Sequence, residues 1–158
     1  MTLAGRFTNL WTRTPRLIVQ MSRLHGALYR RTGGRFVPRW FAGAPVMVLE
    51  VVGRRSGQLR ATPVLYLRDG DDLVVVAANA GSHATPAWWL NLRASGEATA
   101  VIGRDRVGVR ARVATAGERA RLWPRLVAMY PAMDDYVRFT TREIPVVILS
   151  PQPRPASA

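Results

Sequence analysis

A short arginine-rich turn bounded by glycines carries the strongest chemical signal in the sequence. Residues 53–60 have the sequence Gly-Arg-Arg-Ser-Gly-Gln-Leu-Arg and directly follow an apolar stretch. Glycine permits a tight turn with free backbone amides, and planar guanidinium groups bind phosphates and carboxylates through paired hydrogen bonds. The glycine spacing matches neither a Walker loop nor a dinucleotide fingerprint. The turn predicts a site for an anionic ligand, with a solvated basic hairpin loop as the alternative from local sequence alone.

Few side chains are available for acid–base or nucleophilic chemistry. The chain has no cysteine, which excludes thiolate nucleophiles and disulfides, and it has two histidines, His25 and His83. His83 is the better candidate because it lies in a loop-like segment, residues 79–86, although no acid is near it in sequence. Two histidines argue against a metal site, and Ser56 and Ser82 lack the glycine-serine-glycine elbow of hydrolases. We therefore infer that an organic cofactor carries the reaction.

Three large side chains recur at every third position in the C-terminal part of the chain, at Tyr130, Met133 and Tyr136. On a helical or turn-rich segment this spacing places them on one side. Core packing is one explanation. A pocket wall is favoured, because a proline and two aspartates between them indicate an exposed segment.

Positive charge is concentrated at the front of the chain. The 158 residues carry a formal net charge of +13 from 23 basic residues, all of which are arginine. Residues 1–49 contain eight arginines and no acid, whereas residues 61–158 contain twelve arginines and nine acids. Genomic codon bias is the simplest explanation for the absence of lysine, since both side chains solubilise a surface. The asymmetry itself indicates an anionic partner: a nucleic acid, a membrane surface or a charged small molecule.

An amphipathic helix is predicted ahead of the arginine turn. Thr14 and Pro15 suit its first turn, apolar residues recur at helical spacing over residues 17–28, and Gly33-Gly34 ends it. Three arginines seven residues apart line one edge. The helix is expected either to pack on the rest of the protein with a solvated basic edge or to lie on a membrane surface.

The rest of the chain is predicted to be mainly β. Strand composition occurs at residues 46–52, 60–67, 73–78, 98–102, 107–113 and 144–149. Asp69-Gly70 indicates a hairpin, and helices are expected at residues 86–93 and 117–129. We expect one domain of α+β class, mainly β with flanking helices, in which about six antiparallel strands form a small barrel.

With these segments in order, the sequence resembles the deazaflavin-dependent nitroreductase family of the split β-barrel superfamily, whose members use coenzyme F420. The resemblance covers the greater part of the chain. The matching residues are 53–58, Arg60, Thr62-Pro63, Tyr66-Leu67, Asp69-Gly70, Asn79, Gly81, 86–88, 91–93 and 142–146.

The resemblance implies where the cofactor and the substrate bind. The phosphate and the oligoglutamate tail of F420 would be held by Arg54, Arg55, Ser56, Gly57, Gln58 and Arg60. The ring system and its side chain would be surrounded by Pro63, Ala77, Ala78, Asn79, Pro86, Ala87, Trp88 and Asn91. The substrate wall would be formed by the candidate catalytic residues Tyr136 and Tyr130 with Met133, and Tyr136 would donate a hydrogen bond to the reduced oxygen. FMN is the second choice of cofactor, and no metal is expected.

The implied activity is that of an F420H2-dependent oxidoreductase that transfers a hydride to a small electrophile, with a quinone such as a menaquinone first and nitro compounds second. Three positions depart from the family pattern. Arg55 stands where lysine is usual, Met133 where nitroreductase-active members have tyrosine, and Ala78 where a hydroxyl is expected. The alternative function is a split-barrel module that binds a flavin or another anionic ligand without turnover.

The resemblance also sets the expected organisation of the chain. Residues 1–43 would form a basic helical region on or beside the barrel, residues 44–150 the split-barrel cofactor domain, and residues 151–158 a disordered tail. We expect a cytoplasmic monomer or homodimer, with peripheral contact to the inner face of the cell membrane through the N-terminal helix. Specific nucleic-acid binding is not expected, because the aromatic residues at the front do not form a stacking platform.

Overall fold

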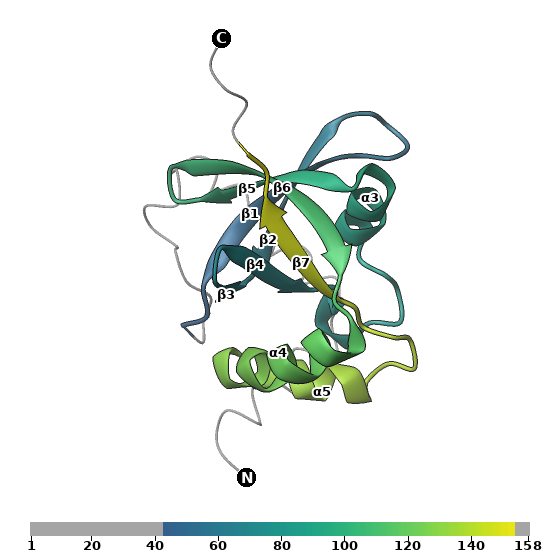
Figure 1. The fold of residues 1–158 in the computed structure, drawn as a ribbon. Coiled ribbons are helices and arrows are strands. Elements are labelled where there is room, and N and C mark those ends of the chain that lie inside the picture. The colour runs from purple at the N-terminus through teal and green to yellow at the C-terminus, as the bar shows by residue number, and fades with distance from the viewer. Residues whose placement is uncertain (1–42, 154–158) are drawn as a thin grey trace.

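An antiparallel sheet of seven strands forms the centre of the computed structural model, which describes residues 43–153 (Figure 1). The strands are β1 (Val46–Val52), β2 (Leu59–Leu65), β3 (Leu67–Asp69), β4 (Asp72–Val76), β5 (Glu97–Ile102), β6 (Asp105–Val113) and β7 (Val146–Pro151). The helices are η1 (Asn79–Gly81), α3 (Ala87–Ser95), α4 (Ala116–Met129) and α5 (Ala132–Arg138). The predicted N-terminal helix and the last residues of the predicted tail lie outside the described residues.

The sheet curls until its two edges approach each other. Its strand order is β2-β1-β5-β6-β7-β4-β3, and every neighbouring pair is antiparallel. Consecutive strands β2 and β3 therefore occupy opposite edges, although Tyr66 alone separates them. One residue can connect the edges only where they lie close together. The result is the curled half-barrel visible in Figure 1.

The predicted strand at residues 60–67 is wrong in one respect, since the structure divides it into β2 and β3 and so contains seven strands instead of six. The division falls at Tyr66, whose side chain is buried and whose backbone N–H donates to the carbonyl of Pro45 at 3.2 Å. Local composition is strand-like throughout, so only the change of pairing partner reveals the break. Pro63 is compatible with β2 because an edge strand does not need every N–H in a ladder.

Two apolar clusters lie on the two faces of the sheet. On β7, Val147 and Leu149 point into the curl and pack in the main core, while Val146 and Ile148 point outward against α4. The main core also contains the fully buried Met47, Leu49, Val75, Leu92 and Val109. The outer cluster is completed by Val74, Leu122 and Leu126. Burial on both faces explains why β4 and β7 are continuous apolar runs.

The helices predicted at residues 86–93 and 117–129 are present as α3 and α4, and α5 is an additional helix. α3 follows Pro86 and ends at Ser95, and the next residue, Gly96, has a left-handed φ of 75°, which favours glycine. α4 begins at a capping box in which the Thr115 side chain and the Glu118 side chain each accept a backbone N–H from the other residue. It continues through Pro124 as one helix. Figure 1 places α4 and α5 together below the sheet and α3 at its side.

Candidate functional site

The predicted arginine turn closes the β1–β2 hairpin. The N–H of Gly53 donates to the carbonyl of Gln58, and the N–H of Gly57 donates to the carbonyl of Gly53, each at 2.8 Å. The φ of Gly57 is 66°, a conformation that favours glycine. Ser56 Oγ accepts from the N–H of Gln58 at 3.3 Å and from Nη2 of Arg60 at 3.5 Å. The arginine side chains therefore extend from a turn whose backbone is held by its own hydrogen bonds.

Asn91 ties this turn to α3. Its Oδ1 accepts from the backbone N–H of Arg54 at 3.2 Å and from Arg54 Nη1 at 3.0 Å, and the Asn91 side chain is 7% exposed. The resemblance implies that Asn91 lies around the cofactor ring system. In the structure its side-chain oxygen accepts from Arg54, so Asn91 also positions the turn.

Within the part of the chain that the structure describes, the arginines of the turn have no carboxylate to neutralise them. Among the described residues, the arginines that form ion pairs with acids are Arg106, Arg110, Arg112, Arg121, Arg125 and Arg138. In contrast, Arg54 contacts Asn91, Arg60 contacts Ser56, and Arg55 has no ion-pair or hydrogen-bond partner within residues 43–153. Three uncompensated guanidinium groups within seven residues make a local site of positive potential.

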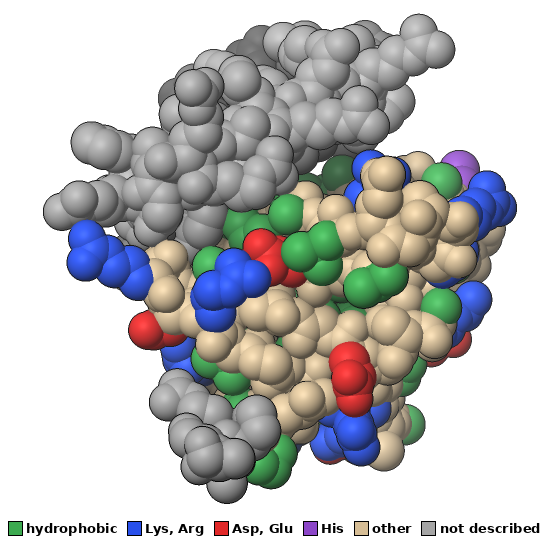
Figure 2. All heavy atoms as spheres, turned by 90° about the horizontal axis from the view of Figure 1, so that it is seen from above, with side chains coloured by type: hydrophobic (Ala, Val, Ile, Leu, Met, Phe, Trp, Pro, Cys, Tyr) green, Lys and Arg blue, Asp and Glu red, His purple; other side chains and the backbone are tan. Residues whose placement is uncertain are grey.

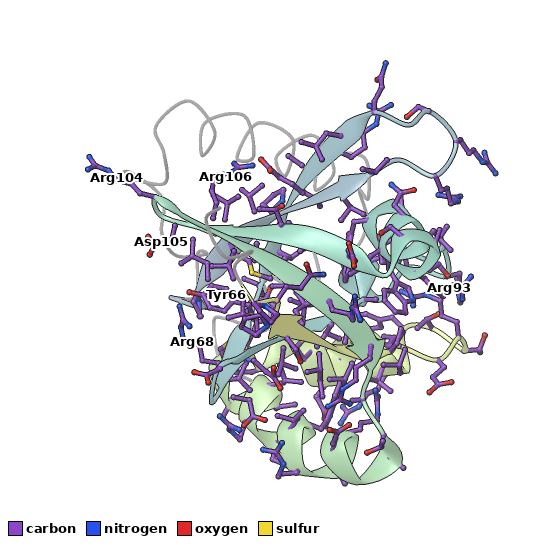
Figure 3. All side chains as sticks on the ribbon, turned by 45° about the horizontal axis from the view of Figure 1, so that its top comes forward. Tyr66, Arg68, Arg93, Arg104, Asp105 and Arg106 are labelled. Carbon is purple, nitrogen blue, oxygen red and sulfur yellow. The ribbon has the colours of Figure 1, made fainter. Side chains whose placement is uncertain are left out.

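The other basic residues between positions 43 and 153 do not form a comparable group. Figure 2 shows arginine side chains spread among acidic ones over the face in view. In Figure 3, Arg93 extends from α3, whereas Arg104 and Arg106 lie at the distant β5–β6 hairpin. Clustering of unpaired arginines thus distinguishes the turn from the rest of the described surface.

The second part of the candidate site is the segment that connects β4 to α3. Ala77 and Ala78 are buried, and Asn79 and Ala80 have positive φ values of 48° and 53°. Asn79 Nδ2 donates to the carbonyl of Ala84 at 2.9 Å, which closes a loop. A substituent on Gly81 would come within 3.2 Å of the Cα of Tyr136, so the loop packs directly against α5.

Two further residues hold this loop, and sequence reasoning assigned neither of them a role. Arg142 donates from Nη2 to the carbonyl of Ala78 at 2.7 Å and from Nε to the carbonyl of Ser82 at 2.9 Å. Thr140 Oγ1 lies 3.3 Å from Nδ1 of His83. Arg142 belongs to the C-terminal segment that matches the family, which was the one signal available. The two carbonyls that it contacts belong to residues sixty or more positions away, so these contacts can be identified only from the fold.

The tyrosines predicted to form the substrate wall are brought together. The hydroxyl oxygens of Tyr130 and Tyr136 are 3.3 Å apart, and their ring centroids are 6.2 Å apart. Burial, and secondarily the neighbouring Tyr130, raises the pKa of Tyr136 well above its ordinary value. The Tyr136 hydroxyl is therefore neutral at physiological pH and is able to donate a hydrogen bond.

The remaining predicted site residues differ in their exposure. Met133 is 5% exposed and packs against Ala78 and Ile144, so it supports the tyrosines from within the core. Trp88 is half-buried, with its ring 6.2 Å from that of Trp89. Pro63 is half-buried on β2, Pro86 is buried, and Ala87 is exposed at the start of α3.

These parts form a connected series of elements. The turn contacts α3 through Asn91, α3 follows directly from the loop that begins at Asn79, and that loop packs against α5 and the tyrosine pair. The series has cationic donors at one end, in the turn, and two tyrosine hydroxyls at the other. Within residues 43–153 no three histidine, cysteine or acidic side chains form a metal cluster, and no helix is long and apolar enough to cross a membrane.

Comparison with known proteins gives a consistent result. Residues 21–151 match the family model described as F420H(2)-dependent quinone reductase. An F420H(2)-dependent quinone reductase of Mycobacterium tuberculosis is 37% identical over 136 residues, which is 84% of this chain and 91% of that protein. Another protein of the same organism is 43% identical over 108 residues, or 68% of this chain and 91% of its own length.

Solved structures agree with this match. The structure of an F420-H2 dependent reductase (FDR-A) superposes with a TM-score of 0.62 at 27% identity, covering 67% of this chain and 94% of the other. A structure described as a domain-swapped dimer gives a TM-score of 0.65 at 25% identity, covering 87% of this chain and 99% of the other.

Proposed function

Because this chain belongs to the F420H(2)-dependent quinone reductase family, we propose that the connected elements described above bind reduced F420 and direct its hydride to a quinone. The chain is an F420H(2)-dependent oxidoreductase, and F420H2 supplies the hydride when it is bound. The chain itself supplies binding, orientation and a hydrogen-bond donor.

The arginine turn fits the anionic part of F420. A phosphate and a row of glutamate carboxylates need several cationic donors, and Arg54, Arg55 and Arg60 provide them without a competing acid. This absence of charge compensation is the single observation that carries the proposal. Because Asn91 already holds the turn in place, the turn loses less conformational freedom when the cofactor binds.

The other end of the site fits a quinone. Reduction of a quinone carbonyl by a hydride leaves negative charge on an oxygen, which then takes a proton. Tyr136 is suited to donate a hydrogen bond to that oxygen, because its hydroxyl is neutral at physiological pH and is supported by Tyr130 at 3.3 Å. We place the ring of the cofactor against the loop at Asn79, next to the tyrosine pair, with its tail running along α3 to the turn.

An equilibrium binding experiment tests the placement of the tail. Arg55→Ala and Arg60→Ala should each weaken F420 binding by about fivefold to tenfold at low salt, with a smaller difference at high salt. Arg104→Ala is the matched control, since Arg104 is an exposed arginine on the distant β5–β6 hairpin, and it should change affinity less than about twofold. An equal loss in all three variants would mean that net charge, and not the turn, governs binding.

Turnover separates an enzyme from a binding module. Wild-type protein mixed with F420H2 and menadione should produce oxidised F420, followed by its absorbance, faster than either reagent alone. Binding of F420 without this catalysed oxidation would favour the non-catalytic alternative.

Membrane contact and oligomeric state extend the proposal. The basic helix predicted within residues 1–43, which falls outside the described residues, would bring the enzyme to a membrane-dissolved menaquinone. Sedimentation with anionic lipid vesicles tests this contact, and size-exclusion chromatography distinguishes a monomer from a homodimer.

A further inference from the structure

Two adjacent residues of the loop between β4 and α3 adopt a conformation that their side chains disfavour. Asn79 and Ala80 have φ values of 48° and 53°, and within residues 43–153 they are the only non-glycine residues with positive φ. Asparagine tolerates this region, but alanine gains nothing from it, because its Cβ crowds the backbone. Such a conformation persists only where surrounding contacts impose it.

Arg142 supplies contacts on both sides of this pair. Its Nη2 donates to the carbonyl of Ala78, directly before the pair, at 2.7 Å. Its Nε donates to the carbonyl of Ser82, shortly after the pair, at 2.9 Å. A guanidinium group is planar and rigid, so the two bonds fix the separation and the direction of these carbonyls. The only other acceptor of this guanidinium within the described residues is the carbonyl of Glu143.

The segment that carries Arg142 is itself attached to the loop. Thr140 Oγ1 accepts from the backbone N–H of Arg142 at 3.3 Å and lies 3.3 Å from His83 Nδ1. On the other side, Gly81 is in close contact with Phe139 and Tyr136. The loop is therefore held between the chain before β7 and α5, and Arg142 is the one charged group in that attachment.

We propose that Arg142 is a positioning residue for hydride transfer, which holds the backbone from Ala78 to Ser82 in the orientation that faces the cofactor ring. The inference rests on the proposed function, because that function identifies the bound ring as the deazaflavin of F420. Arg142 acts through the loop and does not itself touch the cofactor. Since the tail is bound at the distant turn, loss of Arg142 affects the reacting geometry more than it affects affinity.

Amide hydrogen exchange tests the attachment without any cofactor. The N–H of Gly81 donates to the carbonyl of Ala78 and that of Ser82 to the carbonyl of Asn79, each at 3.0 Å. In Arg142→Met these two amides should exchange about tenfold faster or more. Arg119→Met is the matched control, because Arg119 also donates to a backbone carbonyl of the C-terminal segment, that of Ile144 at 2.6 Å, but contacts no loop residue.

Kinetics test the role in the reaction. Arg142→Met should lower kcat about tenfold or more and change the Kd for F420 less than about twofold, whereas Arg119→Met should leave both near the wild-type values. Arg142→Lys keeps the charge but lacks the forked guanidinium group, so its kcat should lie between those of Arg142→Met and the wild type. This milder variant still tests the role of Arg142 if Arg142→Met fails to fold. Ala80→Gly added to Arg142→Met should restore part of kcat, because glycine adopts positive φ without penalty.

The outcomes are distinct. Unchanged loop exchange in both Arg142 variants, or an equal fall of kcat in Arg119→Met, would overturn the positioning role. A wild-type protein that binds no F420 and oxidises none would refute the proposed function instead, and the exchange data would then still decide whether Arg142 holds the loop.

Discussion

Asn91→Leu removes the acceptor that ties the arginine turn to α3. The Asn91 side chain is 7% exposed, and its Oδ1 accepts from Arg54 N at 3.2 Å and from Arg54 Nη1 at 3.0 Å. A neutral hydrogen bond contributes about 1 kcal/mol net and one to a charged donor about 2 kcal/mol. Because the Arg54 side chain is exposed and regains water, we expect the free energy of unfolding to fall by about 1–2 kcal/mol.

The same variant should weaken cofactor binding. Without its attachment the turn must be ordered when F420 binds, so the Kd should rise about tenfold, which corresponds to about 1.4 kcal/mol. Fluorescence titration with F420 and urea unfolding measure the two effects. Asn91→Asp is the informative partner, since it keeps the acceptor but places a carboxylate beside Arg54. That variant should be as stable as the wild type yet bind F420 more weakly. Destabilised Asn91→Leu with wild-type affinity would refute the assignment of the turn as the tail site.

Two further predictions concern the tyrosine pair and the cap of α4. Tyr136→Phe should lower kcat for quinone reduction by about a hundredfold and Tyr130→Phe by less than about tenfold, because we assign the hydrogen bond to the substrate oxygen to Tyr136 and a supporting role to Tyr130. Equal losses in both variants in steady-state kinetics would contradict this division of roles. Arg112 and the cap N–H of Thr115 lower the pKa of Glu118 from 4.5 to about 2, so its stabilising contribution is present above pH 4.5 and is lost as the pH falls towards 2. Urea unfolding should show that Glu118→Gln is less stable than wild type at pH 7 and that this difference in the free energy of unfolding shrinks in acid. Glu143→Gln controls for the loss of one negative charge. A difference that does not depend on pH would exclude this linkage.

Local signals in the sequence predicted most of the elements. Apolar runs bounded by glycine or proline located the strands, and the proline at residue 86 located the start of α3. The division at Tyr66 could not be predicted, because residues on both sides favour strand and the break depends on which edge of the sheet each one pairs with. Non-local pairing of this kind leaves no local signal.

The candidate site shows the same limit. Charge and glycine spacing predicted the arginine turn, but its lack of acidic partners depends on how the fold distributes the carboxylates. Asn91 was predicted near the ligand, and only the structure shows that Arg54 occupies its oxygen. Arg142 was missed as a contributor because an arginine in a loop is usually solvated, and its two carbonyl partners lie sixty or more residues away.

A crystal structure of the F420 complex tests most directly whether the turn and the tyrosine pair form the two ends of one site. We predict phosphate oxygens within about 3.2 Å of the guanidinium groups of Arg55 and Arg60. We also predict the deazaflavin ring against the loop at Asn79, with the Tyr136 hydroxyl beside its open face. A phosphate bound away from residues 54–60, or a ring on the far side of the sheet from α5, would contradict the account.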